Sequence, residues 1–217
     1  MRSLLPARAI LDEFWRCFEK LADELLRRVQ IAKQAPAVHL EQSELPTPLL
    51  QQLRKVSPEL SLEVAATALG AELIVSADGD RDVFPAARAL VAAAPVMQHW
   101  TIRALRPRRG FPDVVRGGTV SLPLSDLFFE PLERELSDDL GLRILARGLR
   151  EADVHDAYSA LMRALESELG EEQLALALQY TEVRPLPPGA QVGRYMPLKQ
   201  LADFIRWRAQ RLQRKLN

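Results

Sequence analysis

The hydrophobic residues of this chain change their spacing twice, and this change limits the folds that it can adopt. Residues 8–34 and the segment from Leu198 onward repeat apolar residues every three or four positions, which is typical of helices with one buried face. Between them, segments such as SLEVAATAL and WTIRALRP alternate apolar and polar residues, which is typical of half-buried strands. The pattern predicts long terminal helices around a central sheet.

The middle of the chain adds further helices and turns to this sheet. Helical spacing predicts helices at about residues 47–55, 83–94 and 154–169, and Gly117-Gly118 predicts a hairpin turn. We interpret QLALALQYTEV as a strand, because its last residues favour strands. The fold class expected is therefore α+β, with an antiparallel or mixed sheet of about six to seven strands packed with helices.

The domain division that follows from this pattern has two parts. Residues 1–56 are expected to form an N-terminal helical segment. Residues 57–217 are expected to form an α+β domain that ends in the C-terminal helix, and the whole chain is expected to be one compact unit.

The overall charge argues against several classes of partner. Its 29 basic and 29 acidic residues cancel, so no net field favours nucleic acid or an anionic membrane. No segment has the roughly 18 apolar residues of a membrane span, and acidic residues interrupt the position of a signal sequence. Cys17, the single cysteine, excludes an internal disulfide and a cysteine-cluster metal site. These features predict a cytoplasmic protein.

The segments LIVSADGD, FPAARALVAAAP and WTIRAL, in this order, resemble an uncharacterised family of bacterial proteins of unknown function. The later segments LFFEPL, LGLRI and YMPL resemble the same family, so the resemblance extends over most of the chain from about residue 60. It supports the α+β fold and implies no activity, cofactor or catalytic residue.

Three aspartates at alternate positions, Asp78, Asp80 and Asp82, raise the question of a metal site. A calcium loop that began at Asp78 would need glycine at its sixth position and glutamate at its twelfth, but Val83 and Ala89 stand there. We therefore expect Asp78-Gly79 to turn the chain and Asp80 or Asp82 to cap the following helix, with no bound metal.

Arginines offer the most promising binding chemistry, since their planar guanidinium groups pair with carboxylate or phosphate. One interpretation is that acidic and basic strands simply neutralise each other. The other is a site for a small anionic molecule. The candidate anion-binding residues are Arg103, Arg106, Arg108, Arg109 and Arg143.

The C-terminal helix has a wider apolar face than one docking contact requires, and it is rich in arginine. Its candidate interface residues are Phe204, Trp207, Arg208 and Arg211. No catalytic constellation and no cofactor motif is evident. We therefore predict a non-enzymatic protein-interaction module that binds a protein partner or a second copy of itself. An enzyme or binding protein for a small anionic ligand is the alternative.

Overall fold

A computed structural model of the chain describes residues 5–31, 39–40, 42–133 and 140–216. The backbone divides into two compact units, unit 1 (Met1–Pro107) and unit 2 (Arg108–Asn217). This boundary differs from the predicted one at residues 56–57. The predicted α+β class is confirmed, but the described strands form two four-stranded sheets and a separate hairpin instead of one large sheet.

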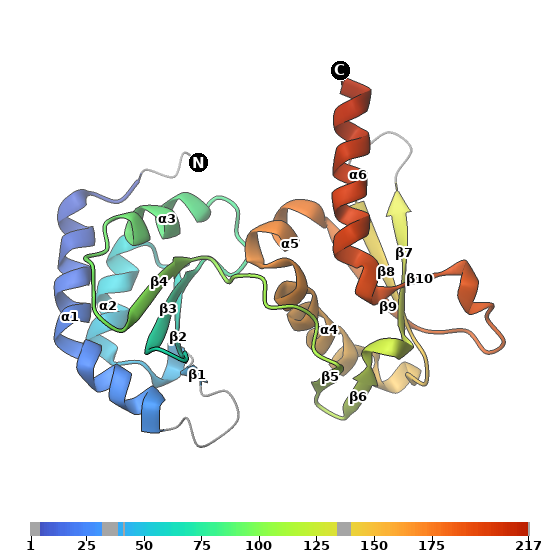
Figure 1. Cartoon of the computed structure of the whole chain (residues 1–217), viewed down its shortest axis with the longest axis horizontal. Coiled ribbons are helices and arrows are strands. Elements are labelled where there is room, and N and C mark those ends of the chain that lie inside the picture. Colours follow the sequence, from blue (N-terminus) through green and yellow to red (C-terminus); the bar gives the residue numbers. More distant parts are fainter. Residues whose placement is uncertain (1–4, 32–38, 41, 134–139, 217) are drawn as a thin grey trace. The chain divides into compact units, whose positions relative to one another are not determined.

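Unit 1 packs three helices on one face of a mixed sheet with the strand order β1-β2-β3-β4 (Figure 1). Its elements are α1 (Arg8–Ile31), β1 (His39–Leu40), α2 (Thr47–Val56), β2 (Ser61–Ala66), β3 (Ala71–Ser76), α3 (Phe84–Ala92) and β4 (Trp100–Ala104). Strands β2 and β3 are antiparallel, whereas β3 and β4 are parallel. Helix α3 is the crossover that joins the parallel strands β3 and β4.

Aromatic residues of α1 form the centre of the core of unit 1. Phe14 and Phe18 are inaccessible to solvent, and the ring of Phe18 lies edge-on against Trp15 and Trp100. The indole nitrogen of Trp15 donates a hydrogen bond of 2.9 Å to the carbonyl oxygen of Leu90 in α3. Helix α1 therefore joins β4 and α3 in one core, as its apolar spacing predicts.

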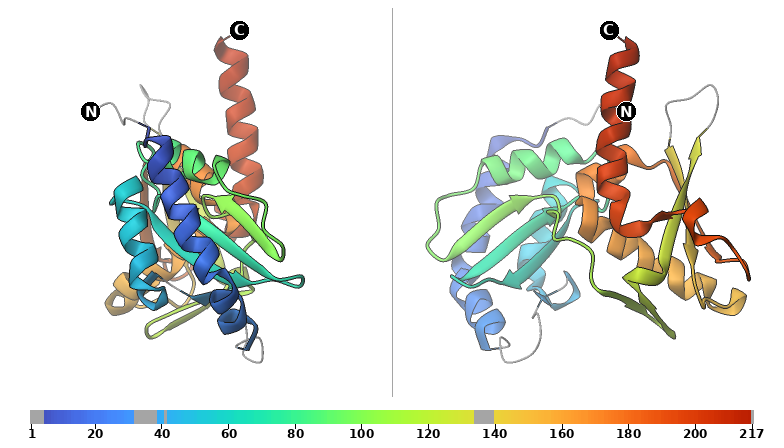
Figure 2. Two further views of the ribbon diagram at one scale, coloured as in Figure 1. Left: turned by 90° about the vertical axis from the view of Figure 1, so that its left-hand side faces the viewer. Right: turned by 45° about the vertical axis from the view of Figure 1, so that its right-hand side comes forward.

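The two faces of the sheet in unit 1 differ in character. Leu62, Leu73 and Ile102 share the face toward the helices, whereas Glu63, Glu72 and Arg103 share the opposite, charged face. Trp100 and Ile102 are half-buried while Arg103 is exposed, so the register predicted for this strand is confirmed. Figure 2 shows α1 lying across the sheet on the helical side.

Unit 2 repeats the strand topology of unit 1. Its elements are β5 (Val114–Gly117), β6 (Val120–Pro123), β7 (Leu127–Glu133), β8 (Leu140–Ala146), α4 (Val154–Leu169), α5 (Glu171–Ala177), β9 (Tyr180–Pro185), β10 (Met196–Pro197) and α6 (Leu201–Leu216). Strands β7 and β8 are antiparallel, helices α4 and α5 follow, and β9 returns parallel to β8. This order matches β2, β3, α3 and β4.

A two-residue edge strand completes each four-stranded sheet but comes from opposite ends of the unit. In unit 1 it is β1, which precedes β2 in the chain; in unit 2 it is β10, which follows β9 and pairs with β7. The terminal helix of each unit is the neighbour of this edge strand in the sequence, since α1 precedes β1 and α6 follows β10. The two units thus share a topology with their terminal elements permuted.

The interpretation of QLALALQYTEV as a strand was wrong for its first half. Residues 173–177 of this segment belong to helix α5, and only the part from Tyr180 joins the sheet. Alanine and leucine favour the helix, and the apolar side of α5 packs beside α4. Helix α2 begins without a side-chain cap, because Pro46 occupies its N-cap position.

We predict that Phe18→Ala destabilises the protein by about 3–5 kcal/mol, because the change leaves a cavity between two tryptophan rings. Urea unfolding followed by tryptophan fluorescence measures this loss. The matched control is Ile31→Ala at the exposed end of the same helix, which should change the unfolding free energy by less than about 0.5 kcal/mol. Equal effects of the two changes would contradict the packing described.

Candidate functional site

The three aspartates lie in and beside the turn that follows β3. Asp78 and Gly79 both have positive φ, of 50° and 82°, and the amide of Asp80 donates to the carbonyl of Ala77 at 3.0 Å. The predicted turn is therefore confirmed. The predicted cap is wrong, because Val83 occupies the N-cap of α3, and the Asp80 carboxylate instead accepts a 2.9 Å hydrogen bond from the amide of Asp82.

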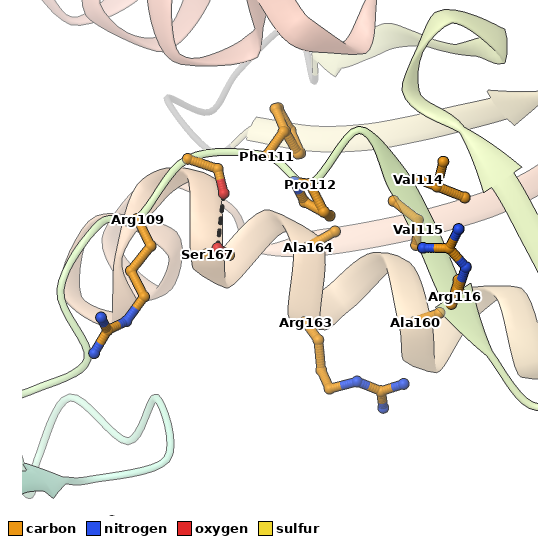
Figure 3. A pocket seen from close by; sticks show the side chains of 11 residues that line it. Arg109, Phe111, Pro112, Val114, Val115, Arg116, Ala160, Arg163, Ala164 and Ser167 are labelled. Atoms are coloured by element: carbon orange, nitrogen blue, oxygen red, sulfur yellow. Dashed lines mark hydrogen bonds between the residues drawn. The ribbon is translucent and has the colours of Figure 1, made fainter. Parts of the chain in front are cut away.

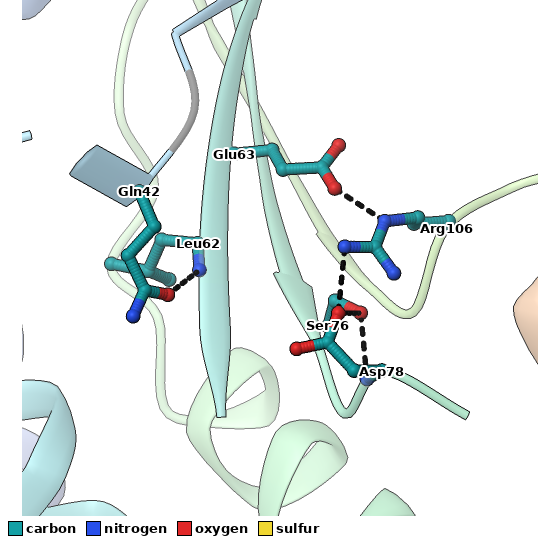
Figure 4. A network of polar contacts seen from close by, with 6 residues as sticks. All are labelled: Gln42, Leu62, Glu63, Ser76, Asp78 and Arg106. Carbon is teal, nitrogen blue, oxygen red and sulfur yellow. Dashed lines mark hydrogen bonds and ion pairs between the residues drawn. The ribbon is translucent and has the colours of Figure 1, made fainter. Parts of the chain in front are cut away.

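Asp78 belongs to a network on the charged face of unit 1 (Figure 4). Arg106 pairs with Glu63 of β2 and, at 2.8 Å, with Asp78. The hydroxyl of Ser76 accepts a hydrogen bond of 3.0 Å from the amide of Asp78. Residues 5–31, 39–40, 42–133 and 140–216 contain no group of three His, Cys, Asp or Glu side chains that could hold a metal ion.

Two arginines of the four-stranded sheets, Arg103 and Arg143, are paired with carboxylates in the same way. On the charged face of unit 1, Arg103 pairs with Glu72, whose side chain is only 7% exposed. In unit 2, Arg143 of β8 pairs with Glu130 of β7 and with Glu182 of β9. Hydrogen bonds to these two carboxylates raise the pKa of the Arg143 guanidinium.

Arg108 has a structural partner as well. Its guanidinium donates to the carboxylate and the backbone carbonyl of Glu168, near the end of α4. The Glu168 side chain is 6% exposed, and its other oxygen accepts a hydrogen bond of 3.0 Å from the amide of Phe111. Glu168 therefore fixes the backbone that leads from Arg108 to Phe111.

The five predicted anion-binding arginines are divided between the two units. Arg103 and Arg106 belong to unit 1, whereas Arg108, Arg109 and Arg143 belong to unit 2. Carboxylates engage Arg103, Arg106, Arg108 and Arg143, and Arg109 lines a cavity in unit 2. The predicted neutralisation of acidic and basic segments thus occurs, but mostly with acidic partners outside the segment 126–139. Residues 134–139 of that segment lie outside the described ranges.

An open groove of about 480 Å³ runs between α4 and the segment 109–116 (Figure 3). Arg109, Arg116 and Arg163 line it, together with apolar side chains that include Phe111, Val114 and other residues of the same segment and of α4. No carboxylate stands among its lining residues in the described part of unit 2. The groove is therefore apolar at its floor and basic at its edges.

Close packing of the β5–β6 hairpin on α4 shapes one end of this groove. A Cβ atom on Gly117 would lie 2.8 Å from Cβ of Ala160 and 2.9 Å from a guanidinium nitrogen of Arg163. Only glycine therefore allows β5 to approach α4 this closely. The carboxylate of Asp156 also accepts a hydrogen bond of 3.1 Å from the amide of Thr119 in the hairpin turn.

Ser167 shapes the other end of the groove. Its carbonyl oxygen accepts hydrogen bonds from the amides of Arg109 and Gly110, at 2.7 and 2.9 Å. Its hydroxyl donates to the carbonyl of Gly110 at 2.7 Å. These bonds hold the segment that carries Arg109 against the last turns of α4.

Only some of the arginines that line this groove were identified from the sequence. Arg109 was among the predicted residues, and Arg116 lies in the same basic stretch, but Arg163 was missed. Arg163 stands on the face of α4 that also carries Ala160, Ala164 and Ser167. This spacing was a signal for a shared helical face, but nothing local indicates that the hairpin lies beside it.

The predicted interface residues lie on α6 in unit 2. Phe204 packs against Phe129 of β7, with ring centroids 5.5 Å apart, and is half-buried. Trp207 is 51% exposed, and the guanidinium of Arg211 lies 5.4 Å from the centre of its ring. Arg208 is half-buried on the same helix. Phe204 thus anchors α6 to its sheet, while Trp207 and Arg211 face outward.

Cys17 lies half-buried on α1, and burial raises the pKa of its thiol. A raised pKa lowers the fraction of reactive thiolate at a given pH. No helix in the described ranges has the length and apolar character needed to cross a membrane.

Comparison of the chain with protein-family models, with curated proteins and with solved structures finds no match. The resemblance to a bacterial family stays a prediction, and the site has to be interpreted from its own geometry.

We predict that Asp80→Ala lowers the free energy of unfolding by about 0.5–1.5 kcal/mol, because the amide of Asp82 loses its acceptor. Asp82→Ala is the matched control and should cost less. Thermal melts with and without millimolar calcium or magnesium complete the measurement, and neither ion should raise the melting temperature. An increase that Asp80→Asn abolishes would show a metal site.

We also predict a specific loss of stability in acid. Hydrogen bonds from Arg184 and Arg143 lower the pKa of Glu182 below its ordinary value of 4.5. A lowered pKa in the folded state stabilises the protein above the ordinary value, and this contribution is lost as the pH falls through the folded-state pKa. Urea unfolding between about pH 7 and pH 3 should show a shallower acid decline for Glu182→Gln than for the unchanged protein. Exposed Glu151, changed to Gln, is the control, and an equal decline in all three proteins would contradict the prediction.

Proposed function

We propose that the protein is a non-enzymatic protein-interaction module, and that the outer half of α6 is its docking element. The observation that carries this proposal is that no side chain between Arg206 and Arg214 is buried. Figures 1 and 2 show α6 starting against the sheet of unit 2 and continuing past the ends of its strands.

A free helical segment of this length benefits from a partner. Isolated helices of fewer than about 12 residues are only marginally stable in water, and in proteins most helical stability comes from packing. The inner half of α6 has this packing through Leu201, Ile205 and Phe204. The outer half presents Trp207 and Arg211 instead, and tryptophan and arginine are the residue types that most often dominate binding energies.

The charge of this segment indicates the kind of partner. Asp203 pairs with Arg206 within the first turns, and no acidic residue follows it in the chain. Arg208, Arg211 and Arg214 therefore give the outer half a net positive charge. An acidic protein surface with a pocket for Trp207 is the complement that we propose.

The proposal assigns no reaction to the protein. The carboxylate pairing of the sheet arginines gives little support to the alternative of a small-anion site on the sheets. A cytoplasmic location of the module is supported by its single cysteine.

The double change Trp207→Ala with Arg211→Gln should abolish association while leaving the fold intact. Sedimentation velocity of the purified protein measures self-association, and quantitative co-precipitation from a lysate of the source organism measures a partner. We expect the affinity of self-association or of partner binding to fall at least tenfold, since truncation of a hot-spot residue costs about 2 kcal/mol or more of binding free energy. The melting temperature should stay nearly constant, because Trp207 is half exposed.

The control for this experiment removes the same kinds of side chain elsewhere. Val96→Ala with Arg54→Gln takes one exposed apolar residue and one exposed arginine from unit 1. Association that both double variants weaken equally, or that neither weakens, would overturn the proposal.

A further inference from the structure

The groove of unit 2 is a second candidate site, distinct from α6 and from the sheet arginines. It combines three guanidinium groups with an apolar floor, and no lining residue in the described part of the chain is acidic. Within the described ranges, the side chains of Arg116 and Arg163 have no hydrogen-bond or ion-pair partner, and both are exposed. Every sheet arginine discussed above, by contrast, has a carboxylate beside it.

The three arginines are spread along the groove and do not converge on one point (Figure 3). Arg109 is held next to Ser167 by its backbone, whereas Arg116 adjoins Gly117, which packs on Ala160. Ser167 and Ala160 are seven residues apart on α4, which corresponds to about 10 Å along a helix. A ligand that contacts both Arg109 and Arg116 therefore needs at least two negative charges about 10 Å apart. A single small anion is too short for this.

The floor between the arginines is made mainly of aliphatic and small side chains, and Phe111 is the single aromatic residue among those that line the groove. Phe111 and Val114 are half-buried in the segment that leads to β5, and Ala164 of α4 is buried. Such a floor fits aliphatic side chains, whereas a surface for single-stranded nucleic acid offers several aromatic residues on which successive bases stack. The neutral net charge of the chain also disfavours nucleic acid.

We propose that this groove binds an extended acidic peptide segment of a partner protein, whose carboxylates pair with Arg116, Arg163 and Arg109 while an aliphatic side chain packs on the floor. In an extended peptide, alternate side chains recur about every 7 Å, so two carboxylates on one side span most of the distance between the two ends. The groove is rigid enough for this purpose, because Gly117, Ser167 and Glu168 fix both of its walls. This site does not depend on α6.

The test is a fluorescence-anisotropy titration of the full chain with labelled peptides of about six residues, long enough to span the groove when extended. One peptide alternates glutamate and leucine, a second alternates glutamine and leucine, and a third alternates glutamate and glycine. We expect binding of the first, at least tenfold weaker binding of the other two, and loss of affinity with added salt. Equal binding of the glutamate and glutamine peptides overturns the proposal.

The variants locate the binding. The double variant Arg116→Gln with Arg163→Gln should bind the glutamate–leucine peptide at least tenfold more weakly. The control Arg54→Gln with Arg194→Gln removes the same charge outside the groove and should change the affinity less than twofold. Trp207→Ala with Arg211→Gln should leave the peptide affinity unchanged, which separates this proposal from that for α6. Circular dichroism and melting curves confirm that each variant is folded.

Competition distinguishes the class of ligand. Inorganic tripolyphosphate and an oligonucleotide of random sequence are added to the complex with the glutamate–leucine peptide. We expect either polyanion to compete only at concentrations well above that of the peptide. The peptide proposal is overturned if the unchanged protein binds tripolyphosphate or the oligonucleotide but not the peptide, and the groove variants no longer bind that polyanion.

Discussion

Buried carboxylates decide which arginines of this protein are free to act. Glu72 and Glu168 are almost inaccessible to solvent, and an unpaired charge in such a position costs several kcal/mol. Arg103 and Arg108 satisfy these charges, and Arg143 does the same for Glu130 and Glu182. These guanidinium groups stabilise the fold and are poorly placed to bind a ligand, because a ligand would have to displace a carboxylate. In the part of the chain that the structure describes, Arg116 and Arg163 belong to no such pair and are exposed to solvent.

The same interaction builds the groove in unit 2. Glu168 binds Arg108 with one carboxylate oxygen and the amide of Phe111 with the other, so it positions the wall on which Arg109 and Val114 stand. Helix α4 supplies Glu168 to one side and Arg163 to another, because residues five apart on a helix lie on different faces. One helix thus carries both the structural carboxylate and a candidate binding arginine.

The shared topology of the two units explains why they use their terminal helices differently. In each unit a strand pair is followed by a helical crossover and a parallel strand, with a short antiparallel strand at the edge. Helix α1 buries residues along most of its length, from Leu11 to Val29. In the part of α6 whose burial is described, residues 201–214, the buried residues lie in the first turns, up to Ile205. The difference leaves an unburied, basic helical segment at the C-terminal end, on which the proposed function rests.

The sequence alone determined the features that depend on local spacing: the helix at residues 8–31, the turn at Asp78-Gly79, the alternation of β4 around Trp100 and, one residue from the predicted Gly117-Gly118, the hairpin turn at Gly118-Thr119. In these cases neighbouring residues carry the whole signal, because backbone geometry fixes which side chains share a face. Only the tertiary structure decided the role of each arginine, since Arg103, Arg106 and Arg108 meet acidic partners 31, 43 and 60 residues away. It also made a helix of residues 171–177, where packing beside α4 outweighed the strand preference of the residues that follow. The groove has the same origin, because its walls come from segments about 50 residues apart that only folding brings together.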